Sequence, residues 1–310
     1  MRWVTYVSPR DGRERPGLLH QDEIYGYAGG DGLVDLLGDR GHRLKLAAEE
    51  AFGKPFEVLP YADAELRSPV PVPPSIRDFM SFEEHVVTSM EATGFPVDPT
   101  WYEFPVFYFT NPAAVKGPHD PVAIAPGSSE FDFELEVAAV IDRDCSDVSA
   151  QEAEDYIAGY TILGDWSARD LQSREMRQSL GPAKGKDSAT SVGPFLVTPD
   201  ELADRRSGKG YDLEMSAYVN DQPYSAGNWK TIYWSFGQMI SYASRGTRLK
   251  RGDLIGSGTV GTGCILELSR VHGTEKYPWL RPGDQVRLEI EGLGTIDTLI
   301  TPGAGVIPLE

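Results

Sequence analysis

The stretch that decides the fold is Phe131-Asp132-Phe133-Glu134-Leu135-Glu136-Val137-Ala138-Ala139-Val140-Ile141. Apolar and acidic residues alternate along its first half, which predicts a β-strand with Phe131, Phe133 and Leu135 on one face and the three acids on the other. The apolar run that begins at Val137 predicts that the strand continues into a core and does not end at a solvated edge.

The acidic face of this strand has two explanations. Neighbouring carboxylates on one strand face stand about 7 Å apart, close enough to repel each other when ionised. A hard divalent cation such as Mg²⁺ or Ca²⁺ would turn that repulsion into chelation, because such ions prefer carboxylate oxygens. The alternative is a half-solvated strand whose acids point into water, where charged side chains normally lie.

Composition narrows the class of protein. The chain has 310 residues and a formal net charge of −18, which argues against nucleic acid and anionic membranes as partners. A small anionic substrate stays compatible, because local cations or a metal can reverse the sign inside a cleft. The two cysteines form no C-x-x-C pair, and the chain shows neither a signal-peptide pattern at its start nor an apolar run of bilayer length. We therefore expect a cytoplasmic protein.

A proline-rich segment, residues 68–74, predicts a boundary between a small N-terminal α/β domain (1–70) and a larger domain (71–310). In the larger part, residues 213–219 alternate into an Asn220-Asp221 turn, and 286–300 read as a closing β-hairpin. Residues 235–244 have helical spacing with Gly246 as a stop. These patterns predict a β-dominated α+β fold.

Three local patterns carry further expectations. Ser81 and Glu84 have the spacing of a capping box at the start of a helix, and Asp165 is predicted where an apolar strand meets a polar turn. The stretch 256–261 has the form G-x-G-x-x-G, but residues 264–268 are strand-like, whereas a dinucleotide site needs a helix there. We therefore expect these glycines to let the backbone pass close to a ligand or to another strand.

Several short motifs, in this order and at these spacings, resemble the fumarylacetoacetate hydrolase family. They are Asp78-x6-His85, Phe133-Glu134-Leu135-Glu136, Gly164-Asp165-Trp166-Ser167-Ala168-Arg169-Asp170-x-Gln172, Gly185-Lys186, Gly256-Ser257-Gly258-Thr259 and Leu266-Glu267-Leu268. The resemblance covers nearly the whole chain. It implies the family's mixed β-sandwich or roll for the C-terminal domain, and a homodimer.

The resemblance also implies a metal site. Glu134, Glu136 and Asp165 would be carboxylate ligands of Mg²⁺, or of Ca²⁺ or Mn²⁺, with Asp78 as a fourth ligand. Such a site would explain the clustered acids of the strand. Water and substrate oxygens would complete the coordination.

The catalytic groups implied by the resemblance surround that metal. His85 would be the general base, oriented by Glu267, and Lys186 with Gln172 would stabilise the oxyanion. The substrate-binding residues would be Arg169, Tyr108, Gly258 and Thr259. For Arg169 the plain alternative is a salt bridge to Asp170 or a solvated side chain.

The implied activity is hydrolysis of a C–C bond in a small anionic 1,3-dioxo acid, such as a fumarylacetoacetate, fumarylpyruvate or acylpyruvate, in the breakdown of aromatic compounds. One departure matters: a large branch of the family has a catalytic Glu three residues after the His, where this chain has Thr88. Glu267 instead matches the fumarylacetoacetate-cleaving branch, whose typical members are longer. Decarboxylation of oxaloacetate, isomerisation of a dioxo acid, and a non-catalytic metal-binding scaffold are the alternatives.

Overall fold

The computed structural model describes residues 1–91 and 96–310. A 12-stranded mixed sheet runs through the molecule in the order β4-β3-β2-β1-β12-β11-β10-β17-β6-β7, with β5 paired to β1 and β8 to β12. Its strands are β1 (Arg2–Val7), β2 (Glu14–His20), β3 (Glu23–Gly26), β4 (Val58–Pro60), β5 (Glu65–Arg67), β6 (Ile76–Phe79), β7 (Phe107–Thr110), β8 (Val115–Lys116), β10 (Phe131–Ile141), β11 (Ile157–Ala168), β12 (Thr190–Val197) and β17 (Leu254–Gly256).

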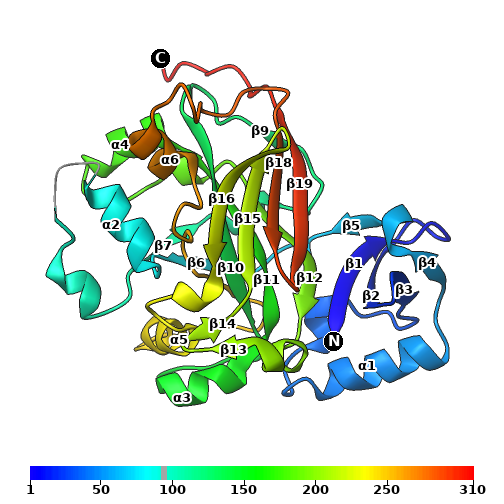
Figure 1. Cartoon of the computed structure of the whole chain (residues 1–310). Coiled ribbons are helices and arrows are strands. Elements are labelled where there is room, and N and C mark those ends of the chain that lie inside the picture. The colour runs from blue at the N-terminus through cyan, green and yellow to red at the C-terminus, as the bar shows by residue number, and fades with distance from the viewer. Residues whose placement is uncertain (92–95) are drawn as a thin grey trace.

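A second sheet of five strands packs against β10, β11 and β12 (Figure 1). It contains β16 (Gln222–Asn228), β15 (Glu214–Val219), β18 (Gln285–Ile290), β19 (Gly294–Thr301) and β9 (Val122–Ala123), and the short pair β13 (Arg206–Ser207) and β14 (Gly210–Tyr211) lies apart from it. The helices are α1 (His42–Gly53), α2 (Glu83–Glu91), α3 (Ala150–Ala153), α4 (Arg169–Met176), α5 (Phe236–Ser244) and α6 (Ile265–His272). The predicted β-dominated α+β sandwich is confirmed.

Strand β10 is buried on both faces. Phe131, Phe133 and Leu135 belong to the main core that fills the space between the two sheets. On the opposite face the acids come first, and Ala138 and Val140 then join a second core. The acids therefore lie inside the protein, and the solvated-strand alternative is wrong.

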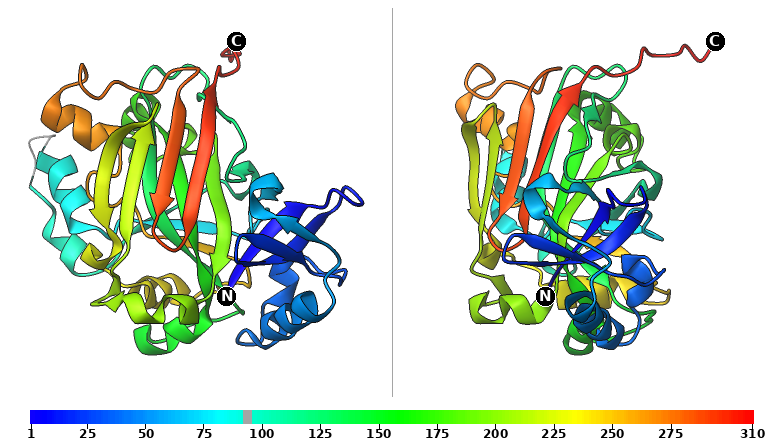
Figure 2. Two further views of the ribbon diagram at one scale, coloured as in Figure 1. Left: turned by 45° about the vertical axis from the view of Figure 1, so that its right-hand side comes forward. Right: turned by 90° about the vertical axis from the view of Figure 1, so that its right-hand side faces the viewer.

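The N-terminal residues extend the main sheet (Figure 2). β1 pairs antiparallel with β12, with Trp3 opposite Leu196. Trp3 and Leu44 lie in the same core cluster as Val140 and Leu254 of the larger part. This small unit shares its core with the body of the protein, and the boundary after residue 70 stays a prediction.

The predicted β15–β16 hairpin and the helix α5 are confirmed, with Ser235 as the N-cap of α5. Two local predictions are wrong. Residues 265–272 form helix α6 and not a strand. A helix at this position still does not make a dinucleotide site, because the N–H groups of Ile265 and Leu266 at the start of α6 already donate to the carboxylate of Asp132. Helix α2 begins at Glu83, and the Ser81 hydroxyl donates to the carbonyl of Ser257 without capping the helix.

No helix within residues 1–91 and 96–310 has the length and apolar character needed to cross a membrane.

Candidate metal and catalytic site

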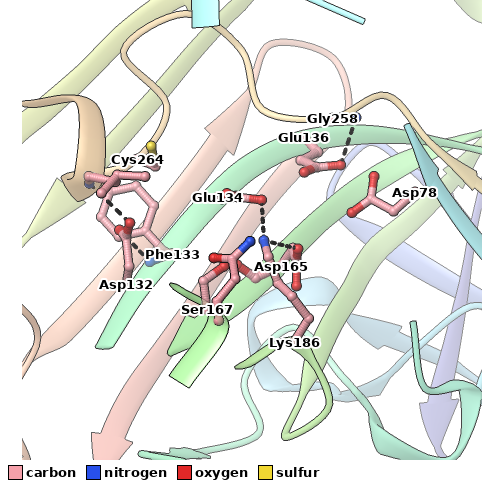
Figure 3. A network of polar contacts seen from close by, with 12 residues as sticks. Asp78, Asp132, Phe133, Glu134, Glu136, Asp165, Ser167, Lys186, Gly258 and Cys264 are labelled. Carbon is pink, nitrogen blue, oxygen red and sulfur yellow. Dashed lines mark hydrogen bonds and ion pairs between the residues drawn. The ribbon is translucent and has the colours of Figure 1, made fainter. Parts of the chain in front are cut away.

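Strand register brings the acids of three strands together (Figure 3). Glu134 of β10 stands directly opposite Asp165 of β11, so Asp165 lies inside its strand and not at the strand end, as the sequence pattern had indicated. Asp78 of β6 pairs with Gly256 of the intervening strand β17. A Cβ at Gly256 would lie 2.4 Å from Asp78 Oδ1 and 3.2 Å from Glu136 Oε2, so only glycine lets these acids approach each other.

The carboxylates of Asp78, Glu136 and Asp165 form a buried acid triad, with one oxygen of each within 4.8 Å of the others. Each has one oxygen in a hydrogen bond. Among the described residues, the other oxygen (Oδ1, Oε1 and Oδ1, respectively) is buried without a partner. A buried carboxylate oxygen without a donor is costly, so these three oxygens fit a hard divalent cation.

The electrostatics of the triad agree with that fit. Burial raises the pKa of Asp165 to about 8 and raises the pKa of Asp78. Burial, together with the nearby charge of Asp78, raises the pKa of Glu136 well above its usual range. Three carboxyls that resist ionisation in one small space need a positive charge among them to be ionised together.

Glu134 is paired differently from the triad. Its Oε2 lies 2.6 Å from Lys186 Nζ, which also contacts Asp165 Oδ2 at 2.5 Å, and its Oε1 lies 2.7 Å from Arg169 Nη2. Burial raises the pKa of Glu134, but the two cations more than offset this, so its pKa lies well below the usual range. Glu134 is thus an ionised neighbour of the triad, and its part as a direct ligand stays a prediction.

His85 and Glu267 meet as the sequence predicts. His85 Nδ1 lies 2.5 Å from Glu267 Oε1, and both side chains are buried. The second oxygen of Glu267 accepts the backbone N–H of Thr262 at 3.0 Å. Cys264, which has its sulfur within 4.8 Å of ligand atoms of His85 and Glu267, forms an isolated β-bridge with Glu134, so the imidazole lies beside the strand that carries the acids.

The remaining predicted residues lie around the same acids, and some of their hydrogen-bonding groups already bind other protein atoms. Tyr108 donates to Asp165 Oδ2 at 2.6 Å and to Asp78 Oδ2 at 3.3 Å. The Gly258 N–H, predicted to bind substrate, donates to Glu136 Oε2 at 2.9 Å, and Thr259 next to it is buried. Gln172 Oε1 accepts from Arg169 at 3.1 Å.

Arg169 is neither solvated nor paired with Asp170. It is buried, and its Nε donates to Asp132 Oδ2 at 2.8 Å. Lys184 is exposed and pairs with Asp187. A cavity of about 360 Å³ opens beside Lys186, between the end of β7 and residues 182–187.

Comparison with known proteins identifies the family. Residues 75–301 match the fumarylacetoacetate (FAA) hydrolase C-terminal family. The chain belongs to this family. A 2,4-didehydro-3-deoxy-L-rhamnonate hydrolase from Sphingomonas sp. (strain SKA58) is 32% identical over 293 residues, which cover 92% of this chain and 91% of that protein.

Solved structures of the family share the fold. Maleylpyruvate hydrolase from Sphingobium sp. SYK-6 has a TM-score of 0.72 and 25% identity, and covers 98% of this chain and 100% of its own; the same enzyme in complex with manganese(II) and pyruvate gives a TM-score of 0.71. A 2-hydroxyhepta-2,4-diene-1,7-dioate isomerase from Mycobacterium marinum has a TM-score of 0.68 and 26% identity, with 97% and 98% of the two chains covered.

Asp132 is a residue of the site that the sequence pattern did not single out. It is fully buried, and it connects two parts of the site. Its carboxylate binds Arg169, which contacts Glu134, and it also accepts the first N–H groups of α6, the helix that carries Glu267. The signal was its place in the alternating strand, on the same face as Glu134 and Glu136.

We expect Asp132→Asn to destabilise the protein by about 3 kcal/mol, because it leaves the buried Arg169 with less compensating charge. An amide would also point N–H donors at Arg169 or at the start of α6. Urea unfolding of the variant measures this loss. Glu130→Gln is the control, because the Glu130 side chain lies outside this network and its backbone carbonyl, which accepts the Arg169 N–H, is unchanged. Equal stability of the two variants would contradict the role given to Asp132.

Proposed function

We propose that this protein hydrolyses a C–C bond in a small 1,3-dioxo acid with the help of a divalent cation. The observation that carries the proposal is the position of a buried imidazole–carboxylate pair, His85 and Glu267, beside an acid triad whose inner oxygens lack partners in the described part of the chain. A metal that only stabilised the fold would need neither His85 nor Glu267.

Asp78, Glu136 and Asp165 would hold the cation, with Glu134 adjacent to them. When bound, the ion supplies positive charge for the carboxylate and 2-oxo oxygens of the substrate and for the charge that develops during cleavage. Mg²⁺, Ca²⁺ and Mn²⁺ all accept such oxygen ligands.

His85 acts as the base in this proposal. With Nδ1 held by Glu267, the other ring nitrogen takes a proton from a water molecule, and the hydroxide attacks the carbonyl farther from the substrate carboxylate. The bond between C3 and the attacked carbonyl carbon C4 then breaks, and its electron pair goes to C3, the carbon next to the 2-oxo group. Return of the proton from His85 to that carbon completes a 2-oxo acid and releases a second carboxylic acid.

Lys186 and Gln172 would stabilise the oxyanion in this proposal. Two of the three Lys186 N–H groups face Glu134 and Asp165, which leaves one for a substrate oxygen. Gln172 uses its carbonyl oxygen for Arg169, so its amide N–H groups are the ones it can offer to substrate. Stabilisation of this kind typically contributes about 10²–10³ in rate.

The names of the relatives support this substrate class. The 32% identical relative is named for a sugar acid with oxo groups at C2 and C4, and the 25% identical structure is named for a maleylpyruvate and holds pyruvate. Both compounds are 2,4-dioxo acids, which would yield pyruvate on hydrolysis. Lys186, which contacts Glu134 and Asp165, also lines the cavity, and the distal part of such a molecule would lie there in this proposal.

Isomerisation of an unsaturated dioxo acid is the second candidate, because one structure at 26% identity is named an isomerase. Decarboxylation would use the same charged site. Both reactions omit the water attack, so they do not need the His85–Glu267 pair as a water-activating base.

Product analysis tests the proposal. Incubation with Mg²⁺ or Mn²⁺ and a panel of 2,4-dioxo acids and oxaloacetate is expected to release equal amounts of pyruvate and a second acid from the dioxo acids. Water labelled with ¹⁸O is expected to place its label in the second acid. Carbon dioxide release from oxaloacetate alone, or a shifted double bond without cleavage, would support the second candidate instead.

A homodimer and a cytoplasmic location belong to the same proposal. Cys145 and Cys264 are both free thiols, which fits the reducing compartment of a cytoplasmic protein. Sedimentation of the purified protein would measure the oligomeric state.

A further inference from the structure

A second group of possible metal ligands lies beside the acid triad and differs from it in chemistry. His85, Cys264 and Glu267 each offer one ligand atom within 4.8 Å of the other two, and all three side chains are buried. Cys264 Sγ lies 3.6 Å from Glu267 Oε1. Cys264 has no part in the proposed reaction.

The ligand set determines which metal would bind. The triad of Asp78, Glu136 and Asp165 offers oxygen only, which suits hard ions. Sulfur, imidazole and one carboxylate instead form a soft, mixed set of the kind that binds Zn²⁺ tetrahedrally, with water as a fourth ligand.

The distances nearly fit such a site. Zinc–ligand bonds of about 2.0–2.3 Å place tetrahedral ligand atoms roughly 3.3–3.8 Å apart. The sulfur–oxygen pair already has this spacing, whereas His85 Nδ1 and Glu267 Oε1, at 2.5 Å, would separate by about 1 Å. Glu267 keeps its second oxygen on the Thr262 N–H during such a shift.

We propose that His85, Cys264 and Glu267 form an inhibitory Zn²⁺ site. Zinc binding there would displace the thiol proton to solvent and shift the imidazole proton from Nδ1 to Nε2. The imidazole and the carboxylate could then no longer activate water. Inhibition rests on the proposed function, but binding does not. The cation in the acid triad would remain in place.

Cobalt(II) absorption tests binding without any activity. Protein saturated with Mg²⁺ and titrated with Co²⁺ is expected to develop a thiolate-to-cobalt charge-transfer band in the near ultraviolet. Cys264→Ser should lose the band, and Cys145→Ser, which changes the other buried cysteine, should keep it. A band that survives in Cys264→Ser, or never forms in the wild type, overturns the site.

X-ray absorption of the zinc-loaded wild type needs no variant. One sulfur neighbour at about 2.3 Å is expected. A shell of oxygen and nitrogen alone would place zinc in the acid triad and overturn the proposal.

Zinc titration of turnover in excess Mg²⁺ tests inhibition. Relative to each protein's own uninhibited rate, Cys264→Ser is expected to need at least tenfold more Zn²⁺ for half inhibition, and Cys145→Ser no more than the wild type. Equal inhibition of all three proteins would show that zinc acts elsewhere. Absence of any turnover would contradict the proposed function. The cobalt band would still test the zinc site, because it does not depend on activity.

Discussion

Alanine in place of His85 is expected to lower kcat by about 10²–10⁴-fold, the usual contribution of a general base. The loss should fall on kcat and not on metal affinity, because the imidazole contacts Glu267 and not the oxygens of the acid triad. Steady-state kinetics on the best dioxo acid, together with calorimetric titration of Mn²⁺, measures both quantities.

The control for this variant is His119→Ala. His119 is exposed, and its Nδ1 lies 3.2 Å from the Asp297 carbonyl oxygen, away from the acids. Its replacement should leave both kcat and Mn²⁺ affinity unchanged. Hydrolysis at a near wild-type rate in His85→Ala would show that His85 is not the general base. A large loss of Mn²⁺ binding in this variant would show that His85 is a metal ligand.

Local pattern and residue type were enough to predict where the acids lie on their strand. A period of two along 131–136 places Glu134 and Glu136 on one face whatever the strand contacts, and the structure keeps them there. The family resemblance then added Asp78, His85 and Glu267 from other segments. The structure brings all of them to one region.

The parts that could not be predicted depend on contacts between distant segments. Residues 264–268 have an apolar pattern that favours a strand, yet they begin helix α6, because Asp132, more than 130 residues earlier in the chain, accepts the N–H groups of Ile265 and Leu266. Likewise, the role of Gly256 depends on its position between Asp78 and Glu136, on two neighbouring strands. Neither contact can be predicted from the local sequence around these residues.

The separation of Glu134 from the triad has a similar cause. Glu134 and Glu136 look equivalent in the strand, but Lys186 and Arg169 reach only the first of them. The two carboxyls therefore differ in the direction of their pKa shifts. The sequence pattern had no means to distinguish them.

Removal of divalent cations is expected to abolish turnover and to destabilise the protein most at high pH. In the metal-free protein, burial raises the pKa of Asp165 to about 8, and burial also raises the pKa values of Asp78 and Glu136. The folded state then binds more protons than the unfolded state, whose carboxyls titrate near pH 4. The free energy of unfolding should therefore fall as pH rises from about 4 through 8.

A bound cation reverses this trend, because it prefers the ionised carboxylates that high pH provides. At a concentration a hundred times its Kd, the ion adds about 2.7 kcal/mol, which corresponds to roughly 4 °C in Tm for a chain of this length. We expect a rise of this size at pH 8 and a much smaller one at pH 5, measured by thermal unfolding with Mn²⁺ and with chelator. Glu136→Gln should lose most of the rise, and Glu275→Gln, which changes an exposed acid, should keep it. An equal rise at both pH values, or one that survives in Glu136→Gln, would show that the cation binds outside the acid triad.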